Sequence, residues 1–518
     1  MNSIENYTVN VLDRLKATGS RDAIVSGTHR ISGTEALETV LRYAAALRDT
    51  GLGNGDGVAL FVENSPEASL LMLAVHFAGC RLVFVPPEPG NSELAAFVQR
   101  AQVKALFFDP GFEERARQIT GRVDVPHVFS IGRSSQATDF LAVAPDHTGL
   151  VPHEAADGRH IATLFYTGGT TGTPKLVTHR SRYYEALTRV SWRYGDEVSA
   201  DPKMLVCTLT THTSGHLASL IGILTGATVV LLRTFDAGSA LSVMRSEQVT
   251  AMMTVTPMLY ELLDHPDCSA GGFRSLRTLF YTGAAAAPAR LRQAVERFGP
   301  VLHQIYGASE NGVVTELTPQ EHDLTRPESL TSCGRPRPGA EVELRDADGR
   351  PVPIGQVGEM YVRSGTVMDG YWNDPERTAE VLDADGWFRS GDLARQDDQG
   401  YLYLVDRVKD IIVTGRTADN VYSRLLDDFL ISLPTVKDAA TIGLPGDDGG
   451  EKVHVVLVPQ DPARVPDFTA LTYRITLALG DLYAPASYWV TGSLPQTAVG
   501  KTDKKALRTT LLAAAQRS

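Results

Sequence analysis

A glycine- and threonine-rich loop is the stretch of this chain best suited to hold a polyphosphate. Directly after an apolar run at residues 161–166, the chain reads Thr-Gly-Gly-Thr-Thr-Gly-Thr-Pro-Lys over residues 167–175. Glycines let backbone amides approach phosphate oxygens closely, threonine hydroxyls add donors, and Lys175 adds a positive charge. The spacing differs from a Walker A loop, because Leu176 follows the lysine where Ser or Thr would bind magnesium. The alternative is a flexible surface linker, but a linker rarely follows a buried strand and ends in Pro-Lys.

The pentapeptide Tyr306-Gly307-Ala308-Ser309-Glu310 is a second candidate for nucleotide chemistry. It follows a predicted strand, so its side chains are expected at the same carboxyl edge as the loop. The aromatic ring can stack on a base, the hydroxyl can meet a phosphate, and Glu310 can hold Mg²⁺. Tyr-Gly turns after strands are common, so the pentapeptide carries little weight alone.

Three further stretches carry charged side chains that gain meaning only in combination. Asp392, in the Ser-Gly-Asp stretch at residues 390–392, can accept hydrogen bonds from both ribose hydroxyls, or it is a turn carboxylate. The run Asp-Arg-Val-Lys-Asp at residues 406–410 is either a charged hinge or an ordinary solvated charge run. Lys501 follows Gly500 just before the last predicted helix, where most lysines belong to the solvated surface.

Alternating strands and helices are expected to position these side chains. Before the loop, strands and helices are predicted at residues 57–62, 66–78, 81–86, 94–102 and 103–108. After it, they are predicted at residues 227–232, 240–247, 250–256, 257–263, 276–281, 288–298 and 301–306. This order predicts α/β architecture with largely parallel sheets, whose ligands lie beyond the carboxyl ends of the strands.

The pattern changes twice toward the C-terminus. Short predicted strands at residues 340–344, 358–363 and 400–405, separated by Asp, Gly and Pro turns, indicate a small antiparallel or barrel-like unit. From about residue 407, strands and helices alternate again on a smaller scale. This last stretch predicts a compact α+β domain.

Length, charge and cysteine spacing restrict the class of protein. A chain of 518 residues exceeds what one hydrophobic core supports, so two or more domains are expected. The net charge of -12 disfavours a general nucleic-acid binder and docking on anionic lipid. The four cysteines are far apart, without a Cys-x-x-Cys pair, which indicates free thiols in a reducing compartment. The N-terminus lacks signal-peptide order and no apolar run makes a convincing membrane span, so a soluble, cytoplasmic protein is predicted.

Together, in this order and at these separations, the motifs resemble the adenylate-forming superfamily of acyl-CoA synthetases, adenylation domains and luciferases. The resemblance runs from about residue 20 to Arg508. It implies a large N-terminal domain, residues 1–408, built of two α/β subdomains and a β-barrel-like unit. A small mobile α+β domain, residues 409–518, would pivot at the hinge residue Lys409 and carry the catalytic lysine.

The resemblance also implies an ATP- and Mg²⁺-dependent ligase, in which an acid's carboxylate displaces pyrophosphate to give an acyl-adenylate. Lys501 would bridge the carboxylate and the α-phosphate oxygens, because a desolvated cation between two anions stabilises the transition state of their reaction. CoA is the implied co-substrate. The implied catalytic residues are Lys501, Thr167, Glu310 and His212. The implied nucleotide contacts are Thr167, Gly168, Gly169, Thr170, Thr171, Gly172 and Lys175 at the β- and γ-phosphates, Gly283, Ala284, Ala285 and Tyr306 around adenine, Ser309 at the α-phosphate, Asp392 and Arg407 at the ribose, and Glu310 at the metal. Gly307 is also an implied nucleotide-binding residue.

The segment Thr-His-Thr-Ser-Gly-His at residues 211–216 matches the acid-pocket entrance of the family. Amino-acid-activating members place an aspartate there to pair the substrate ammonium, and none occurs between residues 209 and 220. A fatty, aryl or bulky polycyclic acid without an α-amine is therefore predicted. His212 and His216 also suggest zinc, but the Glu of the helical metalloprotease motif is missing, so His212 is interpreted as a pocket wall near the carboxylate. The implied acid-binding residues are His212, Ser214, Gly215, His216, Gly283 and Gly307.

The loop after the predicted hinge departs from the family pattern. CoA-binding members carry Gly-Gly-x-Asn and then a Pro-x-Glu helix start, whereas here Arg416 replaces the second glycine and two residues look inserted. Ser423 and Leu425 replace the proline and the glutamate. Arg416 either blocks the pantetheine arm of CoA or pairs with a CoA phosphate. The alternative to an acyl-CoA synthetase is therefore an adenylating enzyme with a weak or absent CoA step, which passes the acyl group to a carrier protein or a partner ligase. A retired enzyme kept as an ATP-binding regulator is disfavoured, and the oligomeric state is left open.

Overall fold

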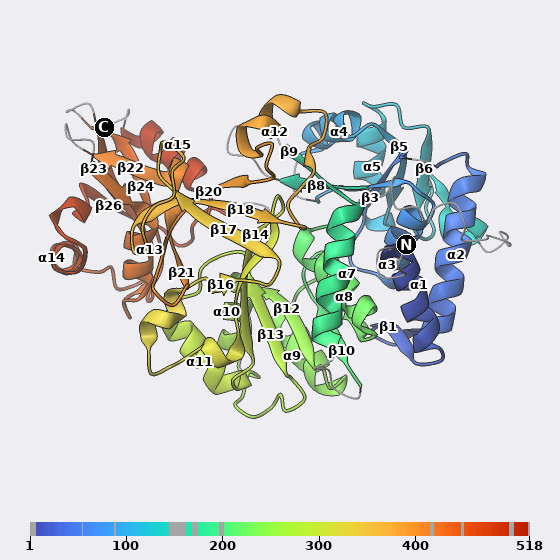
Figure 1. The fold of residues 1–518 in the computed structure, drawn as a ribbon, viewed down its shortest axis with the longest axis horizontal. Coiled ribbons are helices and arrows are strands. Elements are labelled where there is room, and N and C mark those ends of the chain that lie inside the picture. The colour runs from blue at the N-terminus through green and yellow to red at the C-terminus, as the bar shows by residue number, and fades with distance from the viewer. Residues whose placement is uncertain are drawn as a thin grey trace. The chain divides into compact units, whose positions relative to one another are not determined.

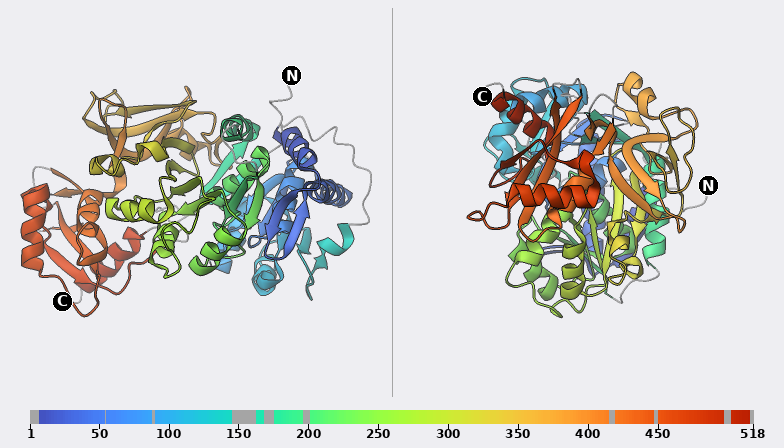
Figure 2. Two further views of the ribbon diagram at one scale, coloured as in Figure 1. Left: turned by 90° about the horizontal axis from the view of Figure 1, so that it is seen from below. Right: turned by 90° about the vertical axis from the view of Figure 1, so that its left-hand side faces the viewer.

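The computed structural model of the chain (Figures 1 and 2) describes residues 7–53, 55–87, 90–144, 162–167, 175–195, 201–414, 419–446, 450–496 and 502–515. The chain divides into two compact units. Unit 1 comprises Met1–Thr282, Val295–Val314 and Ser364–Gly386, and unit 2 comprises Gly283–Ala294, Thr315–Arg363 and Trp387–Ser518. This grouping does not test the expected boundary between residues 408 and 409, which stays a prediction. None of the helices in the described ranges is long and apolar enough to cross a membrane.

The first sheet of unit 1 contains the strand that leads into the glycine- and threonine-rich loop. Its strands lie in the order β19 (Gly370–Tyr371), β9 (Lys175–Arg180), β8 (Ala162–Thr167), β4 (Arg81–Phe84), β3 (Gly57–Phe61), β5 (Val103–Phe108), β6 (His127–Ser130) and β7 (Thr138–Asp139). The pairs from β8 to β7 are parallel, whereas β9 pairs antiparallel with both β8 and β19. Every residue of β3 is buried, as expected for a parallel strand covered on both faces.

The second sheet of unit 1 carries the strand that ends in the Tyr-Gly-Ala-Ser-Glu pentapeptide. It includes, in order, β14 (Leu302–Ala308), β13 (Thr278–Thr282), β12 (Ala251–Val255), β10 (Lys203–Val206), β11 (Thr228–Leu231), β1 (Asp22–Ser26) and β2 (His29–Ser32). These pairs are parallel except for the β1–β2 hairpin. Both sheets therefore have the largely parallel character that the sequence predicts.

Helices cover these sheets and begin where local cap chemistry predicts. α2 (Gly33–Asp49) starts with a capping box of Ser32 and Glu35, and α3 (Pro66–Phe77) starts with Ser65 as cap and proline in its first turn. α7 (Ser181–Gly195) and α8 (Thr213–Thr225) pack against each other (Figure 1). The described part of unit 1 also contains the helices α1 (Tyr7–Thr18), α4 (Asn91–Arg100), α5 (Glu113–Thr120), α6 (Phe140–Val143), α9 (Ala237–Ser246), α10 (Thr256–Asp264) and α12 (Pro375–Val381).

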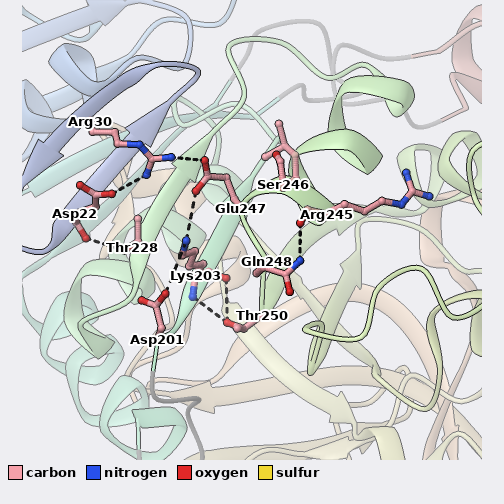
Figure 3. Close-up of polar contacts among 11 residues, drawn as sticks. Asp22, Arg30, Asp201, Lys203, Thr228, Arg245, Ser246, Glu247, Gln248 and Thr250 are labelled. Carbon is pink, nitrogen blue, oxygen red and sulfur yellow. Dashed lines mark hydrogen bonds and ion pairs between the residues drawn. The ribbon is translucent and has the colours of Figure 1, made fainter.

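An ion-pair cluster closes the amino-terminal edge of the second sheet (Figure 3). The carboxylate of Glu247, just after α9, lies 2.5 Å from the Arg30 guanidinium and 3.4 Å from the Lys203 ammonium. Arg30 also pairs with Asp22 at 2.7 Å. Ligands of parallel sheets bind at the opposite, carboxyl edge, so this cluster stabilises the fold and does not belong to the candidate site.

Unit 2 contains the two smaller sheets. The first has the order β17 (Ala340–Arg345), β18 (Val357–Ser364), β20 (Phe388–Gln396) and β21 (Leu402–Arg407), with antiparallel β18–β20 and β20–β21 pairs. This antiparallel sheet lies where the sequence predicts a small antiparallel or barrel-like unit. Also in this unit, residues 315 and 316 of β15 (Gly312–Leu317) pair antiparallel with β16 (Arg335–Pro336), and α11 (Pro288–Phe298) begins here.

The C-terminal part of unit 2 is a sheet with helices on both faces (Figure 2). Its order is β23 (Asp419–Tyr422), β22 (Ile411–Thr414), β25 (Glu451–Pro459) and β24 (Val436–Pro445), and β26 (Ser487–Val490) also pairs with β25. Apolar side chains of α13 (Ser423–Ile431) and α14 (Phe468–Leu479) share one buried cluster with the sheet. Those of α15 (Lys504–Ala515) share another. This is the small α+β arrangement that the sequence predicts.

Candidate active site

The Ser309–Glu310 pair lies in the tight turn between β14 and β15, in unit 1. A Cβ atom on Gly307 would lie 1.8 Å from the carbonyl oxygen of Gly312, so the approach of the two strands requires glycine at position 307. Gly312 itself has a φ of 63°. The Asn311 side chain accepts a hydrogen bond from the Ala308 amide at 2.6 Å, which closes the turn. The pair is therefore presented on a backbone that has little freedom to move.

Two elements distant in sequence hold Ser309 in place. His179 of β9 donates from Nε2 to the Ser309 carbonyl oxygen at 2.5 Å, and its ring stacks on Tyr183 with centroids 4.1 Å apart. Complete burial lowers the pKa of His179 to about 4, so the ring is neutral and carries its proton on Nε2. On the other side, the Ser309 hydroxyl lies 3.0 Å from the hydroxyl of Thr213, the first residue of α8. The pentapeptide thus contacts residues 211–216, the expected acid-pocket segment.

Glu310 is connected to Lys175 through the hydroxyl of Tyr371. Lys175, the first residue of β9, donates to the Tyr371 hydroxyl at 3.1 Å, and its ammonium lies 4.5 Å from the centre of the ring. The hydroxyl donates in turn to Glu310 Oε1 at 3.4 Å. Burial and the Glu310 carboxylate both raise the pKa of Tyr371, so the phenol keeps the proton that it donates. The amide of Met368 also donates to the Glu310 carbonyl oxygen at 2.7 Å.

His212 caps the helix that carries the acid-pocket segment. Its Nδ1 accepts from the Ser214 amide at 3.4 Å and lies 3.2 Å from the Ser214 hydroxyl. A Cβ atom on Gly215 would lie only 2.1 Å from the carbonyl oxygen of Leu209. Close packing of α8 on the preceding loop therefore explains glycine at position 215 by itself, and its role in acid binding stays a prediction.

His216 belongs to a buried chain of polar side chains. Its Nε2 lies 3.3 Å from the Tyr184 hydroxyl, which hydrogen bonds to Thr163, and Thr163 lies 2.9 Å from Nε2 of His76. Burial lowers the pKa of both histidines to about 3, so both rings are neutral. This chain links α3, β8, α7 and α8 behind the site. A direct contact between His216 and the acid stays a prediction.

In unit 2, the structure brings together the two residues expected at the ribose. Asp392 of β20 pairs in register with Arg407 of β21, and Arg407 Nε lies 3.0 Å from Asp392 Oδ1. The alternative of a turn carboxylate is wrong, because Asp392 lies within a strand with 8% of its surface exposed. Lys409, the expected hinge residue, is exposed in the short 3₁₀ helix Val408–Asp410.

Residues around the expected catalytic lysine form an ion pair of low exposure in unit 2. Lys504, three positions after Lys501, lies 2.6 Å from the Asp427 carboxylate and donates to the Ser423 hydroxyl at 2.8 Å. The Ser423 hydroxyl also lies 3.3 Å from Asp406 Oδ1. Asp406 is 4% exposed, so the run 406–410 is not simply a solvated charge run. Ser423, one of the departures from the family pattern, thus has a defined structural role.

Some of the other expected site residues lie within the ranges that the structure describes, and the rest lie outside them. Thr167, the last residue of β8, lies opposite Lys175 in the antiparallel register. Tyr306 is half-buried at the end of β14. Gly283, with a φ of 91°, begins an exposed turn before α11 that includes Ala284 and Ala285. The expected residues that lie outside the described ranges are Gly168, Gly169, Thr170, Thr171, Gly172, Arg416 and Lys501.

No sequence pattern identified His179 or Tyr371 as residues of the site. His179 stands in the alternating strand Leu-Val-Thr-His, and Tyr371 stands between a glycine and a tryptophan. Neither stretch carries a composition or spacing that distinguishes it from ordinary β-structure. Their partners, Ser309 and Glu310, lie far away in the sequence, so only the folded arrangement identifies them.

Comparison with known proteins places these motifs in a family. A family model described as AMP-binding enzyme matches residues 12–372. The medium/long-chain-fatty-acid–CoA ligase FadD8 of Mycobacterium tuberculosis is 35% identical over 513 residues, with 95% of this chain and 88% of that protein covered. The 3-[(3aS,4S,7aS)-7a-methyl-1,5-dioxo-octahydro-1H-inden-4-yl]propanoyl:CoA ligase of Rhodococcus jostii is 31% identical, with 95% and 96% covered.

A solved structure is similar over nearly the whole chain. The amide bond synthetase McbA from Marinactinospora thermotolerans matches with a TM-score of 0.87 at 36% identity, covering 97% of this chain and 99% of that chain. The predicted fold class and the predicted enzyme class, a ligase of the acyl-CoA synthetase type, are confirmed by these similarities. The chain belongs to the AMP-binding enzyme family.

Proposed function

We propose that this chain uses ATP and Mg²⁺ to convert a carboxylic acid without an α-amine into an acyl-adenylate, and then transfers the acyl group to CoA. One observation carries the proposal. The Ser309–Glu310 pair contacts Thr213 of the acid-pocket segment and, through Tyr371, Lys175 at the end of the phosphate loop. Three stretches with separate expected roles thus converge on one turn, as a reaction between an acid and a nucleotide requires.

The donor set at this turn fits Mg²⁺ bound together with phosphates. Among the described residues, no group of three or more His, Cys, Asp or Glu side chains is arranged to hold a metal ion by itself. Mg²⁺ commonly takes one or two protein carboxylates and completes its shell with water and substrate phosphates, and Glu310 would supply such a carboxylate. When bound there, the ion would neutralise charge on the phosphates. We assign Lys175 to the β- and γ-phosphates, Ser309 to the α-phosphate, Asp392 and Arg407 to the ribose, and Lys501 to the reacting oxygens.

His212 suits the carboxylate of the acid. Because its Nδ1 accepts from the Ser214 amide, the ring carries its proton on Nε2, and an N–H group can donate to an anionic oxygen. The relatives FadD8 and the Rhodococcus jostii ligase are named for a fatty acid and a polycyclic propanoic acid. With no aspartate in the acid-pocket segment, we infer that this chain takes an acid of the same broad kind, fatty, aryl or polycyclic.

An amine is the second candidate acceptor for the acyl group. The amide bond synthetase McbA is 36% identical over nearly the whole chain, and the loop at residues 415–425 departs from the pattern of CoA-binding relatives. Both observations would be explained if the acyl-adenylate reacts with an amine in place of a thiol. A carrier protein or a partner ligase remains the further alternative. A cytoplasmic location also stays a prediction.

Pyrophosphate exchange across a panel of carboxylic acids tests the first half-reaction. We expect acid-dependent exchange that requires Mg²⁺ and is lost in Glu310→Ala. Exchange that persists undiminished in this variant after chelation of Mg²⁺ contradicts the metal assignment.

The acceptor is decided by product analysis. The preferred acid is incubated with ATP, Mg²⁺ and either CoA, a panel of small amines, or no acceptor, and the products are separated by mass. Rapid and complete acyl-CoA formation supports the first proposal. Accumulation of acyl-AMP with CoA, together with amide formation when an amine is added, supports the second.

A further inference from the structure

The backbone of Tyr371 is fixed from two sides. β19 adds to the edge of β9 with Tyr371 opposite Val177. The Tyr371 amide also donates to the Thr378 hydroxyl at 2.9 Å, and that hydroxyl donates to the Asp374 carbonyl oxygen at 2.7 Å in the first turn of α12. The residue is 7% exposed. The phenol hydroxyl therefore has a nearly fixed position before any ligand binds.

At that position, the hydroxyl lies between two groups of opposite charge. It accepts from the Lys175 ammonium at 3.1 Å and donates to the Glu310 carboxylate, with the two oxygens 3.4 Å apart. The ammonium also lies 4.5 Å from the ring centre, within the range of a cation–π contact. One neutral side chain thus satisfies a cation and an anion at the same time.

A direct ion pair between Lys175 and Glu310 would compete with nucleotide binding. An ammonium and a carboxylate attract each other strongly at partly buried positions. Once paired, Lys175 would have to leave the carboxylate to reach a phosphate, and Glu310 would have to leave the ammonium to reach Mg²⁺. The Tyr371 hydroxyl gives each group a weaker, neutral partner that is easier to exchange for the ligand.

We propose that Tyr371 is a positioning residue that keeps Lys175 and Glu310 apart and ready to bind phosphate and Mg²⁺. This inference rests on the proposed function, because it gives the two charged groups a nucleotide and a metal to bind. In Tyr371→Phe the ring and its backbone contacts remain, but the hydroxyl no longer separates the charges. Lys175 and Glu310 then pair directly, and the ligand has to break that pair.

The test measures ATP binding by calorimetry, in the absence of acid, so that no turnover contributes. We expect Tyr371→Phe to raise the Kd for ATP with Mg²⁺ about 10-fold, the scale of one hydrogen bond to a charged group. In the Glu310→Gln background, where no ion pair can form, we expect the same substitution to raise the Kd less than about 2-fold. A role in packing alone would cost the same in both backgrounds.

The matched control is Tyr403→Phe, which removes a 3.0 Å tyrosine hydrogen bond to the Asp397 carboxylate in unit 2. It should leave the Kd for ATP unchanged. The inference is overturned if Tyr371→Phe raises the Kd for ATP equally in both backgrounds, or in neither. The proposed function is unaffected by that result as long as the wild-type chain binds ATP. If the wild-type chain does not bind ATP, both are overturned. In a second comparison, Lys175→Met replaces Glu310→Gln, and we expect Tyr371→Phe to raise the Kd for ATP less in this background than in the wild type. An equal rise in the Kd in both backgrounds also refutes the inference.

Discussion

Asn64 is the residue whose replacement most directly tests how the acid-pocket segment is held. It follows β3, and the residue is 1% exposed. Its Nδ2 donates to the carbonyl oxygens of Thr208 and Leu232, both at 3.0 Å, and its Oδ1 accepts from the Thr210 amide at 2.8 Å. One amide thus ties the loop before His212 to the ends of strands in both sheets of unit 1.

We expect Asn64→Ala to destabilise the chain by about 3 kcal/mol, worked from these contacts. The Thr208 carbonyl and the Thr210 amide are buried, and each loses its partner at a cost of roughly 1–2 kcal/mol. The bond to Leu232 is only partly buried, so water replaces Asn64 there and the loss is about 0.5 kcal/mol. For a chain of this size the sum corresponds to a melting temperature lower by roughly 3 °C. Because the loop leads into His212, we also expect a rise in the KM for the acid that exceeds the rise for ATP.

Differential scanning fluorimetry and steady-state kinetics measure both effects, and an isosteric variant separates hydrogen bonding from packing. Asn64→Asp keeps the shape and the acceptor for Thr210, but it places a second oxygen against two carbonyl oxygens. We therefore expect it to be at least as destabilising as Asn64→Ala. The control is Gln136→Ala, which replaces an exposed amide side chain and should have the melting temperature of the wild type. An Asn64→Asp variant with wild-type stability, or a shift below about 1 °C for Asn64→Ala, refutes the hydrogen-bond argument.

Three further predictions concern acid sensitivity, the expected catalytic lysine and the ion-pair cluster of Figure 3. Burial lowers the pKa of His76, His179 and His216 to about 3, 4 and 3, respectively. Between about pH 6.5 and 4, only the unfolded chain therefore binds protons on these side chains, and the free energy of unfolding must fall as the pH falls. Near pH 5 the free energy of unfolding should change by about 4 kcal/mol per pH unit, which is measured as an uptake of nearly three protons on denaturation. An uptake of less than one proton contradicts this prediction. Lys501→Ala should still bind ATP but lose about 100-fold or more in acid-dependent pyrophosphate exchange, whereas a loss below about threefold would assign Lys501 to the surface. Glu247→Gln should destabilise the fold by about 1 kcal/mol without changing KM, and the effect should shrink in 1 M salt as expected for partly exposed ion pairs; a salt-independent loss would contradict this.

Local sequence patterns predicted much of this fold because they depend on neighbours along the chain. The helix predicted at residues 288–298 is α11 (Pro288–Phe298), and the strand predicted at residues 57–62 is β3 (Gly57–Phe61). The rule that parallel strands share a carboxyl edge predicted that the pentapeptide would lie at the same edge as the glycine- and threonine-rich loop, and Glu310 is linked through Tyr371 to Lys175 at the end of that loop. Where the local pattern was ambiguous, the strand pairing decided: Ser-Gly-Asp at residues 390–392 resembles a turn, yet Asp392 pairs with Arg407 across two strands.

Glycine illustrates what a residue type alone leaves undecided. At position 215, the sequence permits either an open pocket wall or a close backbone approach, since both favour a missing side chain. The folded chain shows the close approach, with the absent Cβ 2.1 Å from the Leu209 carbonyl oxygen. Gly307, expected to contact nucleotide and acid, is likewise required by the neighbouring strand. Both residues were found by sequence, but the reason for glycine came from the tertiary structure.

The sequence by itself determined the family, the alternation of strands and helices, and the residues whose chemistry suits phosphate, metal and carboxylate. The tertiary structure alone decided which side chains hold those residues in place. Tyr371 is 196 residues from Lys175, and His179 is 130 residues from Ser309. Their contacts exist because β19 adds to the edge of β9 and because the β14–β15 turn comes close to β9. Such contacts depend on how whole strands are ordered in space, which no periodicity within a short window of residues encodes.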